Sequence, residues 1–362
     1  LRQVLAESLA TLAAYPDPTI AEAAVAARHE RPTSEVLMTA GAAEAFVLLA
    51  RAVRPAHAVI VHPQFTEPEV ALRSAGHQVD RVMLDAADGF RLHPEQIPPS
   101  ADLVIIGNPT NPTSVLHPAQ TLRAIARPGR MLVVDEAFMD AVPGEPESLA
   151  NARDVPGLLV IRSMTKMWGL AGLRIGYAVG EARVLGALSR AQPLWAVSSP
   201  ALAAGAACFS PRAQNEAMTT ALQTDLQRAY LLERLATLPQ VRTYGRARAP
   251  FVLIETAGAD RILTMDLHAG QIQGFFNVPV DELTALYVLG RYFRERGDMS
   301  NTTVLSPDVG GAKRARNMAR QIGAPLAVVD KERSGNDESA SATGLIGDVR
   351  GRHVIISDEE IL

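Results

Sequence analysis

The sequence predicts an α/β protein whose first part contains a mostly parallel sheet. From about residue 15 to residue 200, helical patterns alternate with short apolar runs rich in β-branched residues. The runs are continuous rather than alternating, which is typical of parallel strands buried on both faces. Apolar residues make up 48% of the 362-residue chain, enough for two domains with cores of ordinary size. Ligands of such sheets bind beyond the carboxyl ends of the strands, so polar residues there are candidates for a site.

The elements of this first part follow in a regular order. An amphipathic helix is expected over residues 1–14, ending at the turn Tyr15-Pro16-Asp17-Pro18. Towards the end, a long helix is expected over 211–237 and a strand-like run over 251–254. The strands expected between them are 58–61, 103–106, 131–134 and 158–161. Polar or Gly/Pro residues follow the last three of these strands, at 107–109, 135–136 and 162–163.

A second α/β alternation begins after Gly258. Within it the polar segment Lys331–Thr343 is expected to form a loop. The change of character predicts a domain boundary near residue 258, with a separate segment over 258–362. The strands expected in the second alternation are 262–265, 303–305, 326–329 and 353–356.

Composition excludes several classes of protein. The chain has 35 basic and 39 acidic residues without a Lys/Arg run, which argues against a nucleic-acid partner. No apolar run approaches the roughly 20 residues that span a bilayer, so no membrane partner is expected. The single Cys208 excludes an intrachain disulfide framework and suits the cytoplasm.

The segment 163–174 gathers residues that suit pyridoxal phosphate (PLP). This cofactor needs a lysine for its aldehyde, an acid for its ring nitrogen, donors for its phosphate and a ring against its face. Lys166 follows a predicted strand, and Ser163, Thr165 and Arg174 could bind the phosphate. The alternative is a surface Lys and Arg beside a Gly-rich loop, which is the better interpretation of this segment taken alone.

Four other places supply the remaining groups. Asp135 ends a strand and could hold the ring-nitrogen proton, although an acid at a strand end is common. Asn111 could donate to the 3-oxygen of the ring, or could belong to a Pro-rich turn. Residues 41–44 open a helix whose free N–H groups could cradle phosphate, or form a plain helix start. Phe65 could stack on the ring or belong to the core.

Together and in this order, these segments resemble fold-type I PLP enzymes of the aminotransferase class I/II family over roughly residues 10–255. Within this family they look most like the histidinol-phosphate aminotransferase and threonine-phosphate decarboxylase branch. The resemblance implies a three-layer αβα PLP-binding large domain over 1–200 and the start of a small domain over 201–257. It also implies a homodimer, because Tyr15 matches a tyrosine that reaches the partner subunit's phosphate. Carried over, Lys166 is the Schiff-base lysine, Asp135 the ring-nitrogen partner and Asn111 the 3-oxygen donor, while Phe65 stacks and Ala42, Ala43, Ser163, Thr165 and Arg174 bind phosphate.

One departure from the family concerns Phe138. Aminotransferases usually carry there a Tyr that hydrogen-bonds the ring oxygen. The run Asp135-Glu136-Ala137-Phe138, followed by Asp140, resembles the threonine-phosphate decarboxylases of cobalamin biosynthesis and related cobalamin-pathway aminotransferases. It favours the decarboxylase branch, while the choice between loss of CO2 and loss of the α-proton stays open at this point.

The last part of the chain resembles a different family. Residues 259–276, 306–311, 330–333 and 346–349 are similar to ribose-phosphate pyrophosphokinase, which implies a partial phosphoribosyltransferase-like αβα segment over 258–362. For the individual residues named next, equally good interpretations are a His in the core, an Asp that caps a helix and a charged loop exposed to solvent. Carried over, His268 and Asp308 contact Mg2+ or its nucleotide, Lys331 and Arg333 lie on a flexible catalytic loop, and Asp358 and Glu359 bind ribose hydroxyls.

Three functions are compatible with this organisation. The first is a PLP-dependent aminotransferase or decarboxylase, for a phosphorylated amino acid or amino alcohol, with a vestigial C-terminal segment. The second is a pyrophosphokinase-related protein of nucleotide biosynthesis. The third is an inactive truncated fusion, because each half is expected to be incomplete and to join the other between Glu255 and Ala259 without a Gly/Ser linker. In particular, the motif of an Arg that clamps the substrate α-carboxylate is not found.

Overall fold

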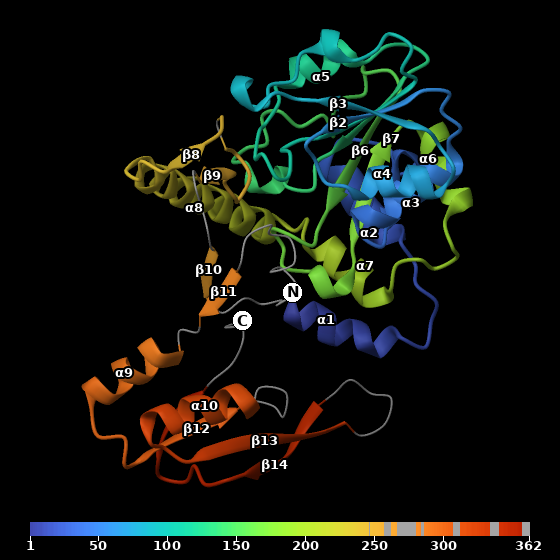
Figure 1. Cartoon of the computed structure of the whole chain (residues 1–362). Helices are drawn as coiled ribbons and strands as arrows, with labels where there is room; N and C mark the ends of the chain where they lie inside the picture. The colour runs from blue at the N-terminus through green and yellow to red at the C-terminus, as the bar shows by residue number, and fades with distance from the viewer. Residues whose placement is uncertain are drawn as a thin grey trace. The chain divides into compact units, whose positions relative to one another are not determined.

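A computed structural model describes residues 1–245, 247–256, 262–265, 280–283, 286–306, 312–333 and 340–356 (Figure 1). The chain divides into two compact units, Leu1–Ala257 and Gly258–Leu362, and each is described by itself. The division of the first unit near residue 200 remains a prediction.

A seven-stranded sheet forms the centre of the first unit. Its strand order is β1-β7-β6-β5-β4-β2-β3. The five strands from β6 to β3 in this order run parallel, whereas β7 is antiparallel to both of its neighbours. The predicted mostly parallel sheet is therefore confirmed. The strands are β1 (Val36–Thr39), β2 (Ala58–His62), β3 (Val79–Met83), β4 (Leu103–Gly107), β5 (Met131–Asp135), β6 (Leu158–Ser163) and β7 (Gly176–Gly180).

Apart from the edge strand β3, the strands of this sheet are buried on both faces. Along β5, Leu132 and Val134 belong to one hydrophobic core and Val133 to the other, as the alternation of side chains in a strand requires. Each face is covered by helices, which gives the three layers of an αβα sandwich. Helices α3 (Ala42–Ala52), α4 (Glu67–Ser74) and α6 (Ala182–Ala191) pack on one face, and α2 (Thr19–Arg28), α5 (Ala119–Ile125) and α7 (Ser199–Ala207) pack on the other.

Other elements of the first unit lie outside these layers. The predicted first helix is shorter than expected, with α1 at Arg2–Ser8 followed by a 3-10 turn at Leu9–Thr11, whereas the predicted long helix is present as α8 (Pro211–Ala236). The predicted strand over 251–254 is wrong. Only Ile254 belongs to a strand, β9 (Ile254–Thr256), which pairs with β8 (Val241–Thr243), because Phe251 instead packs its ring against that of Phe138.

The carboxyl ends of three neighbouring strands coincide in register. Gly107 at the end of β4 lies opposite Asp135 at the end of β5, and Asp135 lies opposite Ile161 on β6, two residues before Ser163. Residues that are far apart in the sequence therefore meet at one edge of the sheet. This edge carries the candidate site.

The second unit has its own mixed sheet, in the order β14-β13-β12-β15. The predicted loop Lys331–Thr343 is wrong for the residues that the structure describes. Residues 331–333 continue one strand and 340–343 begin the next, because the two pair as an antiparallel ladder with a register shift at Asp330/Lys331. The elements are β10 (Ile262–Met265), β11 (Val280–Leu283), α9 (Leu286–Arg296), β12 (Thr302–Ser306), α10 (Ala312–Ile322), β13 (Leu326–Arg333), β14 (Ala340–Ile346) and β15 (His353–Ile356).

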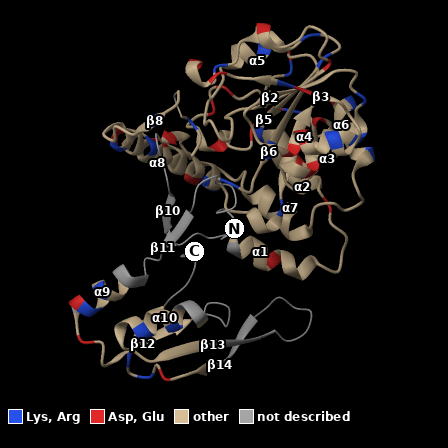
Figure 2. Ribbon diagram, viewed as in Figure 1, with Lys and Arg blue, Asp and Glu red and all other residues tan. Residues whose placement is uncertain are grey.

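Surface properties agree with the composition. Figure 2 shows basic and acidic residues interspersed over the helices of the first unit. Among the helices that the structure describes, none is both long enough and apolar enough to pass through a lipid bilayer.

Candidate active site

A cavity of about 110 Å³ lies at the carboxyl edge of the sheet in the first unit. It brings together every residue that the sequence analysis assigned to PLP except Tyr15. Tyr15 is 73% exposed and stacks on Trp195, with ring centroids 4.0 Å apart. The cavity is lined by Ala42, Ala43, Phe65, Gly107, Pro109, Asn111, Asp135, Ala137, Phe138, Ser163, Thr165, Lys166 and Arg174.

One end of the cavity is formed by the N-terminus of α3. Gly41 caps this helix with φ = 79°, a backbone conformation that residues other than glycine rarely adopt. The free N–H groups of the first helical turn and the partial positive charge of the helix favour an anion here. Arg174 adds a full positive charge, because its guanidinium lies so close to Gly41 that a Cβ there would be 2.7 Å from Nη2.

Two hydroxyl groups complete this end. Ser163 ends β6, and its Oγ lies 2.7 Å from Oγ1 of Thr165. Both residues are buried, and both line the cavity. Helix N–H groups, a guanidinium and two hydroxyls are the donors that phosphate oxygens accept from. This end of the cavity can therefore hold a phosphate group.

A buried carboxylate lies elsewhere in the cavity wall. Asp135 is 8% exposed, and its Oδ1 accepts a hydrogen bond of 3.0 Å from the backbone N–H of Ala137. The pKa of Asp135 is raised from 3.8 to about 6, chiefly by burial and also by the nearby Glu136, while the hydrogen bond from Ala137 and the positive charge of Lys166 act to lower it. A cationic N–H group placed against this carboxylate would stabilise its ionised form.

Lys166 is exposed at the cavity, and aromatic rings lie beside it. Its Nζ is 5.7 Å from the centroid of the Phe138 ring. Phe251, from the segment after α8, packs edge-on against Phe138 at 5.0 Å. Phe65, 42% exposed, also lines the cavity and offers a ring face. An amine, a carboxylate and flat apolar surfaces thus surround one space.

A close backbone contact between β7 and α3 shapes the phosphate end. A Cβ added to Gly176 would lie 2.6 Å from the carbonyl oxygen of Arg162 and 3.0 Å from the backbone nitrogen of Ala42. Because both neighbours are backbone, they cannot rotate away. We expect Gly176→Ala to lower the free energy of unfolding by about 2 kcal/mol and to weaken PLP binding by displacing the start of α3.

Denaturant unfolding and PLP titration together test this expectation. Gly172→Ala is a matched control, because a Cβ there has no heavy atom within 4 Å. Equal PLP affinity in Gly176→Ala and the natural chain would contradict the role given to this contact.

The comparisons with known proteins agree with this geometry. A model of the family described as aminotransferase class I and II matches residues 2–276. The chain belongs to the aminotransferase class I and II family. PLP is the cofactor of this family, and the cavity fits it: the donors at the α3 end suit its phosphate, the exposed Lys166 its aldehyde, and the partly satisfied Asp135 its ring nitrogen.

Curated relatives cover most of this member of the aminotransferase class I and II family. A histidinol-phosphate aminotransferase of Mycobacterium tuberculosis is 47% identical over 71% of this chain and 70% of its own length. Threonine-phosphate decarboxylase of Salmonella typhimurium is 31% identical over 73% of this chain and 76% of its own. Among solved structures, aspartate aminotransferase of Thermus thermophilus superposes with a TM-score of 0.63 at 25% identity, covering 70% of this chain and 72% of that one.

The second unit matches a different family. A model described as phosphoribosyl transferase domain matches residues 288–361 of this aminotransferase-family chain. Ribose-phosphate pyrophosphokinase of Bradyrhizobium diazoefficiens is 50% identical over 118 residues, which are 33% of this chain and only 37% of that enzyme. The chain thus spans little more than a third of the pyrophosphokinases it matches.

The structure gives no side-chain geometry for the residues predicted to form sites in the second unit. His268, Asp308, Asp358 and Glu359 lie outside the described residues. The backbone of Lys331 and Arg333 lies on β13 rather than in a loop, which corrects their expected setting. Within the part of the chain that the structure describes, no group of three or more His, Cys, Asp or Glu side chains could hold a metal ion.

Besides Phe138, three lining residues were not assigned to the site from the sequence. Gly107 is the last residue of β4, Pro109 lies two residues after it, and Ala137 follows β5, so their positions at strand ends were a usable signal. Their side chains carry no polar group, and residue type alone did not distinguish them from ordinary turn residues.

Proposed function

We propose that this chain transforms the amino-bearing carbon of a phosphorylated amino acid or amino alcohol, with PLP held in the cavity at the sheet edge. The observation that supports this most directly is the convergence of Lys166, Asp135 and the phosphate-binding end on one cavity. The substrate class follows from the relatives, one described as a histidinol-phosphate aminotransferase and one as a threonine-phosphate decarboxylase.

The phosphate of PLP is assigned to the α3 end of the cavity. The backbone N–H groups of Ala42 and Ala43 and the hydroxyls of Ser163 and Thr165 donate to it, and Arg174 neutralises its charge. These groups come from three separate elements, so binding the phosphate also holds α3, β6 and the segment before β7 together. The anion thus fixes one end of the cofactor.

The ring is assigned to the space between Asp135, Asn111 and Phe65. Asp135 keeps the proton on the ring nitrogen, Asn111 donates to the 3-oxygen, and Phe65 covers one face. When bound, PLP withdraws the electrons left at the substrate carbon after a bond to it breaks. Lys166 holds the cofactor before substrate arrives and afterwards moves the proton at that carbon.

Phe138 favours decarboxylation over transamination. It lies against Lys166 and has no hydroxyl to donate to the ring oxygen. Incubation of the PLP-loaded chain with O-phosphothreonine and with histidinol phosphate tests the choice. Release of CO2 would support the decarboxylase branch, whereas 2-oxoglutarate-dependent formation of glutamate would support the aminotransferase branch. If neither forms while PLP is bound, the proposed substrate class is wrong.

The charge of Arg174 should contribute strongly to PLP affinity. Arg174→Met removes a cation whose only described hydrogen bond is a 3.4 Å contact to the Ala171 carbonyl, so the loss falls on the bound phosphate. We expect the half-saturating PLP concentration to rise about 10- to 100-fold, the range for lost charge-assisted hydrogen bonds. Arg190→Met, on the exposed side of α6, should bind PLP as the natural chain does.

A homodimer accompanies this proposal. Tyr15 does not line the cavity of its own chain, and its exposed ring suits a contact with the phosphate of a partner subunit. Light scattering of the PLP-loaded chain tests the dimer. A monomer that binds PLP fully would remove Tyr15 from the set of cofactor-binding residues.

The likeness of residues 288–361 to phosphoribosyl transferase domains supports a second candidate, a pyrophosphokinase-related activity. Mg2+ would then be a further cofactor, with the nucleotide contacts expected at His268 and Asp308. The test is formation of AMP that depends on both ATP and ribose 5-phosphate. Its absence would leave the PLP chemistry as the activity of this chain.

A further inference from the structure

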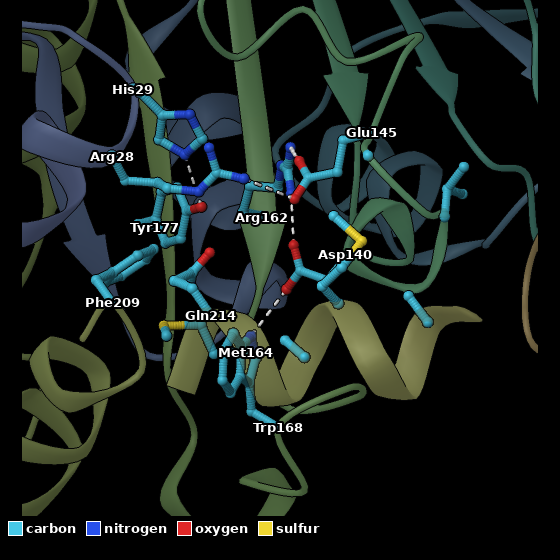
Figure 3. A pocket seen from close by; sticks show the side chains of 15 residues that line it. Arg28, His29, Asp140, Glu145, Arg162, Met164, Trp168, Tyr177, Phe209 and Gln214 are labelled. Atoms are coloured by element: carbon cyan, nitrogen blue, oxygen red, sulfur yellow. Dashed lines mark hydrogen bonds and ion pairs between the residues drawn. The ribbon is translucent and has the colours of Figure 1, made fainter. Parts of the chain in front are cut away.

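A second cavity, of about 120 Å³, lies in the first unit and shares no lining residue with the first (Figure 3). Trp168, two residues after Lys166, lines this second cavity, as does Arg162, four residues before it. The proposed PLP chemistry uses neither side chain. The other lining residues labelled in Figure 3 are Arg28, His29, Asp140, Glu145, Met164, Tyr177, Phe209 and Gln214.

Arg162 is the centre of a buried ionic network. Its side chain is 3% exposed and lies 2.8 Å from Glu136, 2.6 Å from Asp140 and 2.5 Å from Glu145. Glu136 follows Asp135 directly in the sequence and also accepts a 2.7 Å hydrogen bond from the backbone N–H of Leu149. The network therefore holds the ends of β5 and β6 at a set separation.

Asp140 extends this network to the lysine segment. Its Oδ1 accepts from Nη1 of Arg162 at 2.6 Å, and its Oδ2 accepts from the indole N–H of Trp168 at 2.9 Å. Both bonds are drawn in Figure 3, where the carboxylate lies between the guanidinium and the indole. The segment with Lys166 is thus held on both sides, at Arg162 before it and at Trp168 after it.

Lys166 itself has little to restrain it. It is exposed, and its Nζ makes only a 5.7 Å contact with the Phe138 ring among the interactions described for it. Small displacements of a reacting group can slow a reaction by about 100-fold. The direction of its amine therefore depends on how the neighbouring backbone is held.

We infer that Asp140 and Trp168 are positioning residues that direct the Lys166 amine towards the PLP aldehyde. Arg162, in turn, holds the Asp140 carboxylate in place. This inference rests on the proposed function. It assigns the two residues an effect on the rate at which Lys166 reacts. The affinity for PLP should change little, because the N–H groups of Ala42 and Ala43 and the guanidinium of Arg174, at the phosphate end, lie outside the segment between Arg162 and Trp168.

Two substitutions break the same hydrogen bond from opposite sides. Trp168→Phe removes the donor and keeps an aromatic ring. Asp140→Asn keeps the shape but offers one oxygen and one NH2 group, so an oxygen facing Arg162 leaves NH2 facing the indole N–H. Met218→Leu is the control, because Met218 lines the same cavity and has no hydrogen bond to the network.

The test follows the capture of PLP by the full chain at increasing PLP concentrations. The Lys166 amine condenses with the PLP aldehyde, expels one water and forms a C=N bond that absorbs visible light and that borohydride reduces. We expect the limiting rate in Trp168→Phe and in Asp140→Asn to fall about 10-fold or more. The half-saturating PLP concentration should stay within about twofold of the natural value, and Met218→Leu should match the natural chain in both.

The double variant decides whether the two residues act through one bond. Trp168→Phe combined with Asp140→Asn should be no slower than the slower single variant. Unchanged limiting rates in the single variants, or rate losses that multiply in the double variant, would overturn the inference. A natural chain that captures no PLP at all would instead overturn the proposed function, and this inference with it.

Discussion

Replacing Lys166 by alanine should abolish covalent capture of PLP and lower turnover by at least about 10³-fold, since the same amine holds the cofactor and moves the substrate proton. The fold should survive. Lys166 is exposed and has no ion pair among the described contacts, so truncating it breaks no salt bridge, and its charge is the weakest of the influences described on the pKa of the buried Asp135. The melting temperature without PLP is therefore expected to stay close to that of the natural chain.

Because the chain contains few lysines, the residue that carries the PLP adduct can be identified without ambiguity. The sequence contains only two other lysines, Lys313 and Lys331. After borohydride reduction, peptide mass spectrometry should place the adduct on the peptide that contains Lys166. Lys313→Ala serves as the control and should keep both absorbance and adduct. An adduct on Lys313 or Lys331, or one that persists in Lys166→Ala, would refute the assignment.

Asp135→Asn should have the second largest effect, and it should act in opposite directions on activity and on stability. The variant is expected to capture PLP through Lys166 but to lower turnover by about 10²- to 10³-fold, the range for removing one preorganised charge from an active site. Asparagine cannot hold the ring-nitrogen proton by an ionic bond. Undiminished turnover would remove Asp135 from the catalytic groups.

The stability effect follows from the pKa of Asp135. Burial raises this pKa from 3.8 to about 6 in the folded chain. Between these values the folded state binds more protons than the unfolded state, so this group makes stability fall as pH rises through the window. At pH 8 this decrease is complete, and it lowers the free energy of unfolding by about 3 kcal/mol. Without PLP, Asp135→Asn should therefore be more stable than the natural chain at pH 8.

Thermal unfolding without PLP between pH 4 and pH 8 measures this effect. The melting temperature of Asp135→Asn should exceed that of the natural chain at pH 8, and the difference should vanish near pH 4. Saturating PLP should reduce this difference in melting temperature at pH 8, because the protonated ring nitrogen stabilises the ionised Asp135 of the natural chain. A difference that does not vary with pH would show that the Asp135 carboxyl titrates normally in the folded chain.

Local patterns in the sequence predicted the main strands of the first unit and the edge of the sheet at which the site lies. Continuous apolar runs identified β2, β4, β5 and β6, since a strand covered on both faces needs apolar residues at successive positions. Polar residues after these runs indicated the site, since parallel strands end at one edge. For this reason Asp135, Ser163 and Lys166 could be named before their convergence was known.

Local patterns failed where a neighbour distant in the sequence decides the conformation. The apolar run 251–254 has the residues of a strand, but only one of them joins a strand, because the Phe138 ring offers Phe251 a partner outside the sheet. The polar residues 331–333 and 340–343 have the composition of a loop, yet they pair with each other across the described hairpin. Propensity is too weak to override such contacts.

By itself, the sequence determined the layers of the first unit, the strand ends that hold the site, and the residue types that suit PLP. Only the tertiary structure decided which of these residues share a cavity. It also showed that a side chain on Gly176 would collide with the backbone at the start of α3, and that Asp140 accepts hydrogen bonds from both Arg162 and Trp168. The physical reason is the range of the interactions. Periodicity records whether a position is buried, whereas the identity of the atom it meets depends on how distant segments pack.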